Sequence, residues 1–152
     1  MDNISTQMLF IILGILILAS AYFSGSETGM MSLNRYRLRH LEKEKHKGAK
    51  RVSKLLERPD RLIGLILIGN NLVNIAASSI ATIIALRLAV DIGISKDLAL
   101  GIATIVLTLL VLIFAEVTPK TLAALYPEKV SYASSILLSI LMKVLSPLVI
   151  LV

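Results

Sequence analysis

The sequence contains no cysteine and only two histidines, His40 and His46. The absence of cysteine excludes disulfides, thiolate metal ligands and thiol chemistry, and it argues against a site for a soft metal. Both histidines lie in a charged segment, where we expect them to be solvated. The sequence also shows no nucleophile paired with a base, no phosphate-binding loop and no catalytic metal motif, so we expect the chain not to be an enzyme.

Charged residues are missing from long stretches of the chain. Hydrophobic residues make up 56% of its 152 residues, and the mean hydropathy of +0.82 is beyond what a soluble surface tolerates. Each spanning helix needs about 20 apolar residues to cross roughly 30 Å of hydrocarbon. The composition therefore predicts a single integral membrane domain over residues 1–152, with room for three or four spanning helices. The order of apolar and polar segments along the chain, described next, predicts an all-α fold of three interrupted transmembrane helices with additional juxtamembrane or interfacial helices in the lipid bilayer.

The positive charge is concentrated in one segment. The net charge is +6, and eleven of the sixteen Lys and Arg residues lie between Arg35 and Arg61. A basic segment between apolar ones is a topology signal, so we expect no nucleic-acid partner, a cytoplasmic location for this segment and an N-terminus outside. We expect juxtamembrane helices over 34–61, with Asn34 as the N-cap and a stop at Gly48. Their narrow apolar stripes leave two alternatives, helices lying on an anionic leaflet or a solvated charged hairpin.

Three apolar segments are long enough to span the membrane. We place them at residues 1–33, 62–90 and 98–118. The first is not interpreted as a cleaved signal peptide, because it lacks a basic n-region. Asp60 is a plausible cap of the second.

The last segment, 129–152, leaves two alternatives. It is long enough to span, but Lys143 would then lie near the middle of the membrane and Pro147 would interrupt the helix. We favour a juxtamembrane or partly inserted helix over a fourth span. Because the chain stops on an apolar run, we expect it to be a membrane domain cut from a longer protein.

Each expected span carries a polar interruption. The interruptions are Phe23-Ser24-Gly25-Ser26-Glu27-Thr28-Gly29 in the first, Gly69-Asn70-Asn71 with Asn74 in the second, and Glu116 with Thr118-Pro119-Lys120 in the third. Helical rise places Ser24 and Asn70 at matching depths, roughly 13 to 17 Å from the basic edge. Polar groups in hydrocarbon are satisfied best by facing one another, so we expect the three interruptions to meet at one ion site.

The atoms at this meeting point are hard oxygen donors. They are the hydroxyl of Ser24, the amide oxygens of Asn70 and Asn74, the carboxylate of Glu116, and backbone carbonyls freed where glycines break the helices. Such donors suit Mg²⁺, Ca²⁺ or Na⁺. Roles in lining the pathway or forming a hinge are assigned to Ser26, Glu27, Gly69, Asn71 and Pro119.

A simpler alternative holds for several of these residues. Serine and asparagine in spanning helices often only hydrogen-bond to a neighbouring helix, and we prefer that account for Ser26. The Glu116 carboxylate would otherwise need a partner such as Lys120, four residues on. Glu27 would line a vestibule or pair with Arg35 or Arg37.

Taken together, the motifs at 23–31, 69–74 and 114–120 resemble the transmembrane domain of the CorC/CNNM family, called HlyC/CorC in bacteria. The likeness covers essentially the whole chain and is close to the bacterial members. It implies a homodimer in the bacterial inner membrane that exports Mg²⁺, coupled to Na⁺ entry. It also implies that Ser24 with Gly25, Asn70 with Asn74, and Glu116 belong to the ion site. Full-length relatives carry a cytoplasmic pair of CBS modules that these residues lack.

Two functions remain open at this point. The first is a divalent-cation transporter that alternately exposes the ion site. The second is a non-transporting membrane anchor for a cytoplasmic nucleotide-sensing CBS domain, in which the polar motifs would serve only packing.

Overall fold

The computed structural model describes residues 5–151, and all of its elements are helices. In chain order they are α1 (Thr6–Met31), α2 (Arg35–Lys43), α3 (Lys47–Leu56), α4 (Pro59–Ile92), α5 (Lys96–Leu110), the π-helix η1 (Val111–Val117), α6 (Thr118–Leu125), α7 (Pro127–Val144) and α8 (Ser146–Leu151). Three helices among the described residues are long and apolar enough to cross a membrane: α1, α4, and the continuous run from α5 through η1 to α6. The predicted fold class is therefore confirmed.

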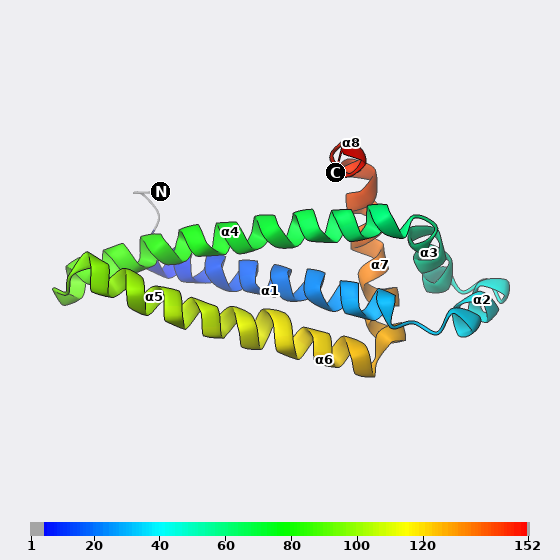
Figure 1. Cartoon of the computed structure of the whole chain (residues 1–152), viewed down its shortest axis with the longest axis horizontal. Coiled ribbons are helices and arrows are strands. Elements are labelled where there is room, and N and C mark those ends of the chain that lie inside the picture. The colour runs from blue at the N-terminus through cyan, green and yellow to red at the C-terminus, as the bar shows by residue number, and fades with distance from the viewer. Residues whose placement is uncertain (1–4, 152) are drawn as a thin grey trace.

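The three long helices run side by side, and α1 packs against both of the others (Figure 1). The short helices α2 and α3 lie at one end of this bundle, which we call the basic end. Helix α7 runs across the long helices at the basic end rather than alongside them. It contacts α1 and α3, which is the arrangement expected of a juxtamembrane helix. Helix α7 ends at Val144 with Leu145 as its C-cap, and the short helix α8, which contains Pro147, begins at Ser146.

The helices are held by apolar side chains at two levels. One buried cluster joins α1 to α4 through residues such as Leu9, Leu13 and Ile80, with the small Ala77 and Ala81 on α4 allowing close approach. A larger cluster lies at the basic end around Phe23, Met30 and Leu138. The outer side of α5 and η1 instead exposes large apolar side chains, among them Ile105, Leu109 and Phe114. This exposed apolar surface is suited to lipid.

The apolar stripes of α2 and α3 pack inside the protein. Leu38 of α2 and Val52, Leu55 and Leu56 of α3 are buried, in the same cluster as Leu138 of α7. The stripes therefore face neither a leaflet nor water, because α2 packs against α3 and α3 packs against α7. The sequence could not show this, since α7 is far away along the chain.

The expected breaks in the first two spans are wrong. Helix α1 continues through Gly25 and Gly29, and α4 continues through Gly69. A helical glycine costs only about 1 kcal/mol relative to alanine, whereas an unsatisfied backbone group in hydrocarbon costs several kcal/mol, so the hydrogen-bonded ladder persists. No backbone carbonyls are freed at Gly25 or Gly69 in this way.

The third span does carry an interruption, and it takes the form of a π-helix. Residues 111–117 form η1, and the Thr118 N–H bonds to the carbonyl of Ile113, five residues back. In a regular α-helix the Pro119 ring would clash with the carbonyl four residues before it, and the π-helix ends two residues before Pro119. Glu116 thus lies in the widened turn.

Two of the three expected helix boundaries at the basic end are wrong. Asn34 is confirmed as the cap of α2, because its side chain accepts the N–H groups of Tyr36 and Arg37. Gly48 does not end a helix: the chain turns at Lys45, whose φ is 64°, and His46 caps α3. Asp60 does not cap α4, which begins with Pro59 at its first turn and has no side-chain cap.

Candidate cation site

Helix α1 supplies the centre of the candidate site through two serines one turn apart. Ser20 and Ser24 are four residues apart, so they share a face of the helix, and both are almost fully buried at 1% and 2% exposure. On either side of α1 lie α4 and η1. The two serines are thereby placed where they reach the polar residues of both neighbours.

The first polar cluster joins Ser20 to the two asparagines of α4. The Ser20 hydroxyl lies 3.0 Å from Asn70 Oδ1 and 2.7 Å from Asn74 Oδ1. A hydroxyl has one proton and can donate it to only one of these oxygens at a time. Two asparagine oxygens therefore share the single proton of the Ser20 hydroxyl, and the lone pairs that remain would be available to a cation.

Ser20 did not figure among the predicted site residues. Its signal was present in the sequence, because Ser20 precedes Ser24 by the same four residues that separate Asn70 from Asn74. Ser20 lies outside the glycine-punctuated stretch, in an apolar run. Attention to helical periodicity, rather than to the interruption, would have identified it.

The second cluster joins Ser24 to the third span. The Ser24 hydroxyl donates to Glu116 Oε1 over a long 3.4 Å, and the other carboxylate oxygen lies 3.0 Å from the Lys120 ammonium. Lys120 is the local ion-pair partner for Glu116 that the sequence analysis gives as an alternative to a bound ion. The ion pair is partly exposed, because the side chains of Lys120 and Glu116 are 49% and 29% exposed.

The structure thus brings residues of all three motifs together, but in two clusters rather than one. The clusters follow successive turns of α1, about 6 Å apart along its axis. Direct Mg²⁺–oxygen distances are about 2.1 Å, so one ion would need bridging water or a helix shift to reach both clusters. The role of these residues as metal ligands stays a prediction.

Three of the other predicted residues line a neighbouring cavity. Gly25, Ser26 and Pro119 border a space of about 560 Å³ between α1, the start of α6, and α7. The Ser26 hydroxyl donates to the carbonyl of Tyr22 on its own helix, 2.6 Å away, which agrees with a packing role. A Cβ on Gly25 would lie 3.5 Å from Pro119 Cβ, an ordinary contact.

The remaining predicted residues lie apart from both clusters. Asn71 is exposed on α4, and Gly69 packs beneath the ring of Phe23 instead of forming a hinge. Glu27 is half-buried and forms no ion pair with any described residue. The expected alternative pair of Glu27 with Arg37 is not formed, because Arg37 pairs with Glu128 of α7.

The donor set of the site consists of oxygens with a single carboxylate. Within residues 5–151, no group of three or more His, Cys, Asp or Glu side chains is placed to hold a metal. A cation here would therefore rely on hydroxyl and amide oxygens together with Glu116. Such a set fits a hard cation that keeps part of its water shell.

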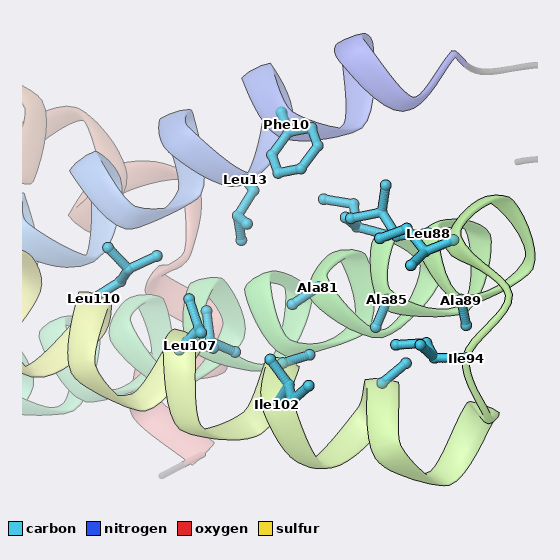
Figure 2. A pocket seen from close by; sticks show the side chains of 15 residues that line it. Phe10, Leu13, Ala81, Ala85, Leu88, Ala89, Ile94, Ile102, Leu107 and Leu110 are labelled. Carbon is cyan, nitrogen blue, oxygen red and sulfur yellow. The ribbon is translucent and has the colours of Figure 1, made fainter.

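The end of the bundle opposite the basic end contains an apolar cavity. A cavity of about 340 Å³ lies there between α1, α4 and α5, and every side chain that lines it is apolar (Figure 2). Phe10, Leu13, Leu88 and Ile102 are among these residues. This cavity therefore offers no side-chain ligand for an ion.

Comparisons with known proteins point to one family. The profile of the cyclin M transmembrane N-terminal domain (CNNM) matches residues 11–152. Over 149 residues, the chain is 61% identical to the UPF0053 inner membrane protein YfjD of Escherichia coli and 55% identical to a UPF0053 protein of Haemophilus influenzae. These alignments cover 98% of the chain but only 33% and 34% of the two relatives. The chain therefore spans about a third of the length of these relatives.

A more distant relative has a descriptive name. The chain is 32% identical over 141 residues to the polyamine export protein of Haemophilus influenzae, an alignment that covers 88% of the chain and 33% of that relative.

Proposed function

The chain belongs to the cyclin M transmembrane N-terminal domain family, and from this premise we propose that it is the membrane domain of a cation transporter. We propose Mg²⁺ as the transported ion, exported as Na⁺ enters. The observation that carries the proposal is the convergence of Ser20, Asn70 and Asn74 oxygens on one proton, with the Glu116 carboxylate one turn away.

The cluster favours a cation because two asparagine oxygens share one donor. The Ser20 hydroxyl carries a single proton, so it can donate to only one of the two oxygens at a time. A cation between these oxygens would satisfy them together. Hydroxyl and amide oxygens accept Na⁺ as well as Mg²⁺, so competition of the two ions for the same oxygens would couple their movements.

Lys120 supplies a way for the site to be neutral when no ion is bound. Its ammonium holds the Glu116 carboxylate at 3.0 Å. An arriving divalent cation would compete with Lys120 for Glu116, and departure of the cation would let the ion pair reform. The π-helix that carries Glu116 ends at Val117, two residues before Pro119, and it gives this segment a different geometry from the regular helices on either side.

The oligomeric state, the membrane and the orientation of the domain are proposed from the family and from the distribution of charge. We propose a homodimer in the bacterial inner membrane, with the N-terminus outside and the basic segment at 35–61 in the cytoplasm. A relative named as an inner membrane protein supports this location. Because the relatives are about three times as long as the chain, there is room in them for the cytoplasmic CBS modules that the resemblance implies.

Polyamine export is a second candidate, favoured by a specific contact. The ammonium of Lys120 on Glu116 shows that this carboxylate accepts a primary alkylammonium group. A polyamine carries the same group, and one relative is named a polyamine export protein. A polyamine needs charge and apolar walls along its length, whereas Mg²⁺ needs a compact set of oxygens. The two substrates therefore predict different responses to loss of the asparagine oxygens.

Flux through proteoliposomes tests the proposal. The full-length protein is reconstituted, and Mg²⁺ and spermidine transport are followed with and without a Na⁺ gradient. Asn70→Ala removes a cluster oxygen, Glu116→Gln removes the carboxylate charge, and Asn71→Ala is the matched control on the exposed side of α4.

The two candidates give different patterns of loss. We expect Asn70→Ala and Glu116→Gln each to reduce Mg²⁺ flux at least ten-fold, about 1.4 kcal/mol in the transport step, with Asn71→Ala unchanged. Loss of spermidine flux in Glu116→Gln, with Asn70→Ala unaffected and no Mg²⁺ flux in the wild type, would favour polyamine export. Wild-type vesicles that move neither cation would favour a membrane anchor for the CBS modules.

A further inference from the structure

A second hollow in the molecule is lined by cations and lies away from the candidate cation site. It has a volume of about 440 Å³ and lies between α3, the start of α4, and the junction of α7 and α8. We call it the basic pocket, and its charged lining residues are Arg51, Lys54, Arg58, Arg61, Lys143 and Glu57. The lining therefore contains five cationic side chains and one carboxylate, around a space large enough for a small anionic group.

Little counter-charge is present to balance these cations. Arg58 pairs with Asp60 at a distance of 3.4 Å. Among the described residues, Arg51, Lys54, Arg61 and Lys143 form no ion pair. The Arg51 guanidinium is held by a 3.1 Å hydrogen bond from its Nε to the Ser135 hydroxyl. Like charges gathered in one hollow repel one another, so an anion bound among them would be stabilised.

The pocket lies where a membrane surface is expected. Arg58 and Arg61 flank the first turn of α4, and the apolar run of that span begins at Leu62. The pocket wall also includes the apolar Leu55 and Met142. This combination of converging cations, apolar wall and membrane edge matches a lipid headgroup, with acyl chains continuing along the span.

We propose that the basic pocket binds the headgroup phosphate of an anionic phospholipid. A free phosphate would use the same cations but would gain nothing from the apolar wall or from the membrane edge. The lining residues come from α3, from the adjoining start of α4, and from α7, which is distant in sequence from both. A bound lipid would therefore fasten the transverse helix α7 to the first turn of α4.

Native mass spectrometry of the detergent-purified full chain tests the proposal with defined lipids. Phosphatidylglycerol and the zwitterionic phosphatidylcholine are added separately, and inorganic phosphate is added as the soluble source of the same chemistry. The pocket variant is Lys54→Gln with Lys143→Gln, because both side chains are exposed and their loss leaves the core intact. The matched control, Lys43→Gln with Lys47→Gln, removes the same charge from exposed sites outside the pocket.

The wild type should prefer phosphatidylglycerol to phosphatidylcholine by at least ten-fold. Each basic residue near a phosphate contributes about five-fold in affinity, so the pocket variant should bind phosphatidylglycerol roughly 25-fold more weakly. The control should change by less than about three-fold, because neither lysine lines the pocket and charges on exposed side chains are screened by salt. Arg61→Gln, a single change inside the pocket, should weaken binding about five-fold and repeats the test independently of the double variant.

Three results would overturn the proposal. Equal loss in the pocket variant and the control would show a diffuse attraction to the basic surface. Equal affinity of the wild type for the two lipids would show that no anionic headgroup is selected. Inorganic phosphate that binds as tightly as phosphatidylglycerol would show that the pocket serves a soluble anion.

Discussion

Replacing Gly69 with alanine tests how closely α1 and α4 approach beside the candidate cation site. A Cβ at this position would lie 2.4 Å from Cζ and 2.6 Å from Cε1 of Phe23, far inside van der Waals contact. The Phe23 ring is 8% exposed and packs edge-on to Tyr22, with ring centroids 5.4 Å apart, so it has little room to withdraw. Overpacking costs about 1 to 3 kcal/mol, and the helix gains about 0.5 to 1 kcal/mol when alanine replaces glycine. We expect a net destabilisation of about 1 to 2 kcal/mol.

The assay is unfolding of the detergent-solubilised chain by titration with a denaturing detergent, followed by circular dichroism. Gly14→Ala and Gly101→Ala are matched controls, because a Cβ at either position meets nothing within 4 Å. These two changes should be neutral or stabilising by up to about 1 kcal/mol. Adding Phe23→Leu to Gly69→Ala should relieve the clash, so the double variant should lose less stability than the two single changes combined. If Gly69→Ala is as stable as the two controls, the close contact with Phe23 does not exist.

Three further changes test individual contacts. Ser20→Ala removes the hydroxyl shared by the two asparagines and should weaken Mg²⁺ binding about five-fold or more, as measured by calorimetry; unchanged affinity would exclude Ser20 from the site. Lys120→Met frees the Glu116 carboxylate from a partly exposed ion pair and should tighten Mg²⁺ binding about two- to five-fold, so weaker binding would contradict competition between Lys120 and the ion. Tyr22→Phe should destabilise the fold by about 1 kcal/mol, because the Tyr22 hydroxyl donates to a backbone carbonyl. Tyr132→Phe should be neutral or stabilising in the same unfolding assay, because the Tyr132 hydroxyl is buried without a partner among the described residues; equal loss in both variants would contradict this difference.

Much of the architecture could be predicted from the sequence because hydrophobic length and charge placement determine it directly. The three spans follow from apolar runs that have few alternatives in a membrane. Helical rise from the basic edge placed Ser24 and Asn70 at similar depth, and the structure links their helices there through Ser20. These inferences depend only on local sequence and on the dimensions of a helix.

The errors concern residues whose role is decided by distant neighbours. The glycine in the second motif predicts a helix break, whereas Gly69 lies in a continuous helix and leaves room for the ring of Phe23 on α1. The stripe that includes Val52 was assigned to a leaflet or to water, but α7 covers it. Ser20 lies in an apolar run, and only the four-residue spacing from Ser24 indicates that it shares a helix face with the site. The contacts of Gly69 and Val52, in contrast, are tertiary contacts that local pattern does not encode.

Calorimetric titration of Mg²⁺ into the purified chain tests the central claim most directly. The wild type, Glu116→Gln and Asn70→Ala are compared at low and high Na⁺, with Asn71→Ala as the control for an asparagine outside the clusters. We predict saturable Mg²⁺ binding that weakens with Na⁺, is lost or reduced at least ten-fold in the first two variants, and is unchanged in Asn71→Ala. Mg²⁺ binding of equal affinity in all four proteins would contradict a site formed by the oxygens around Ser20 and Ser24.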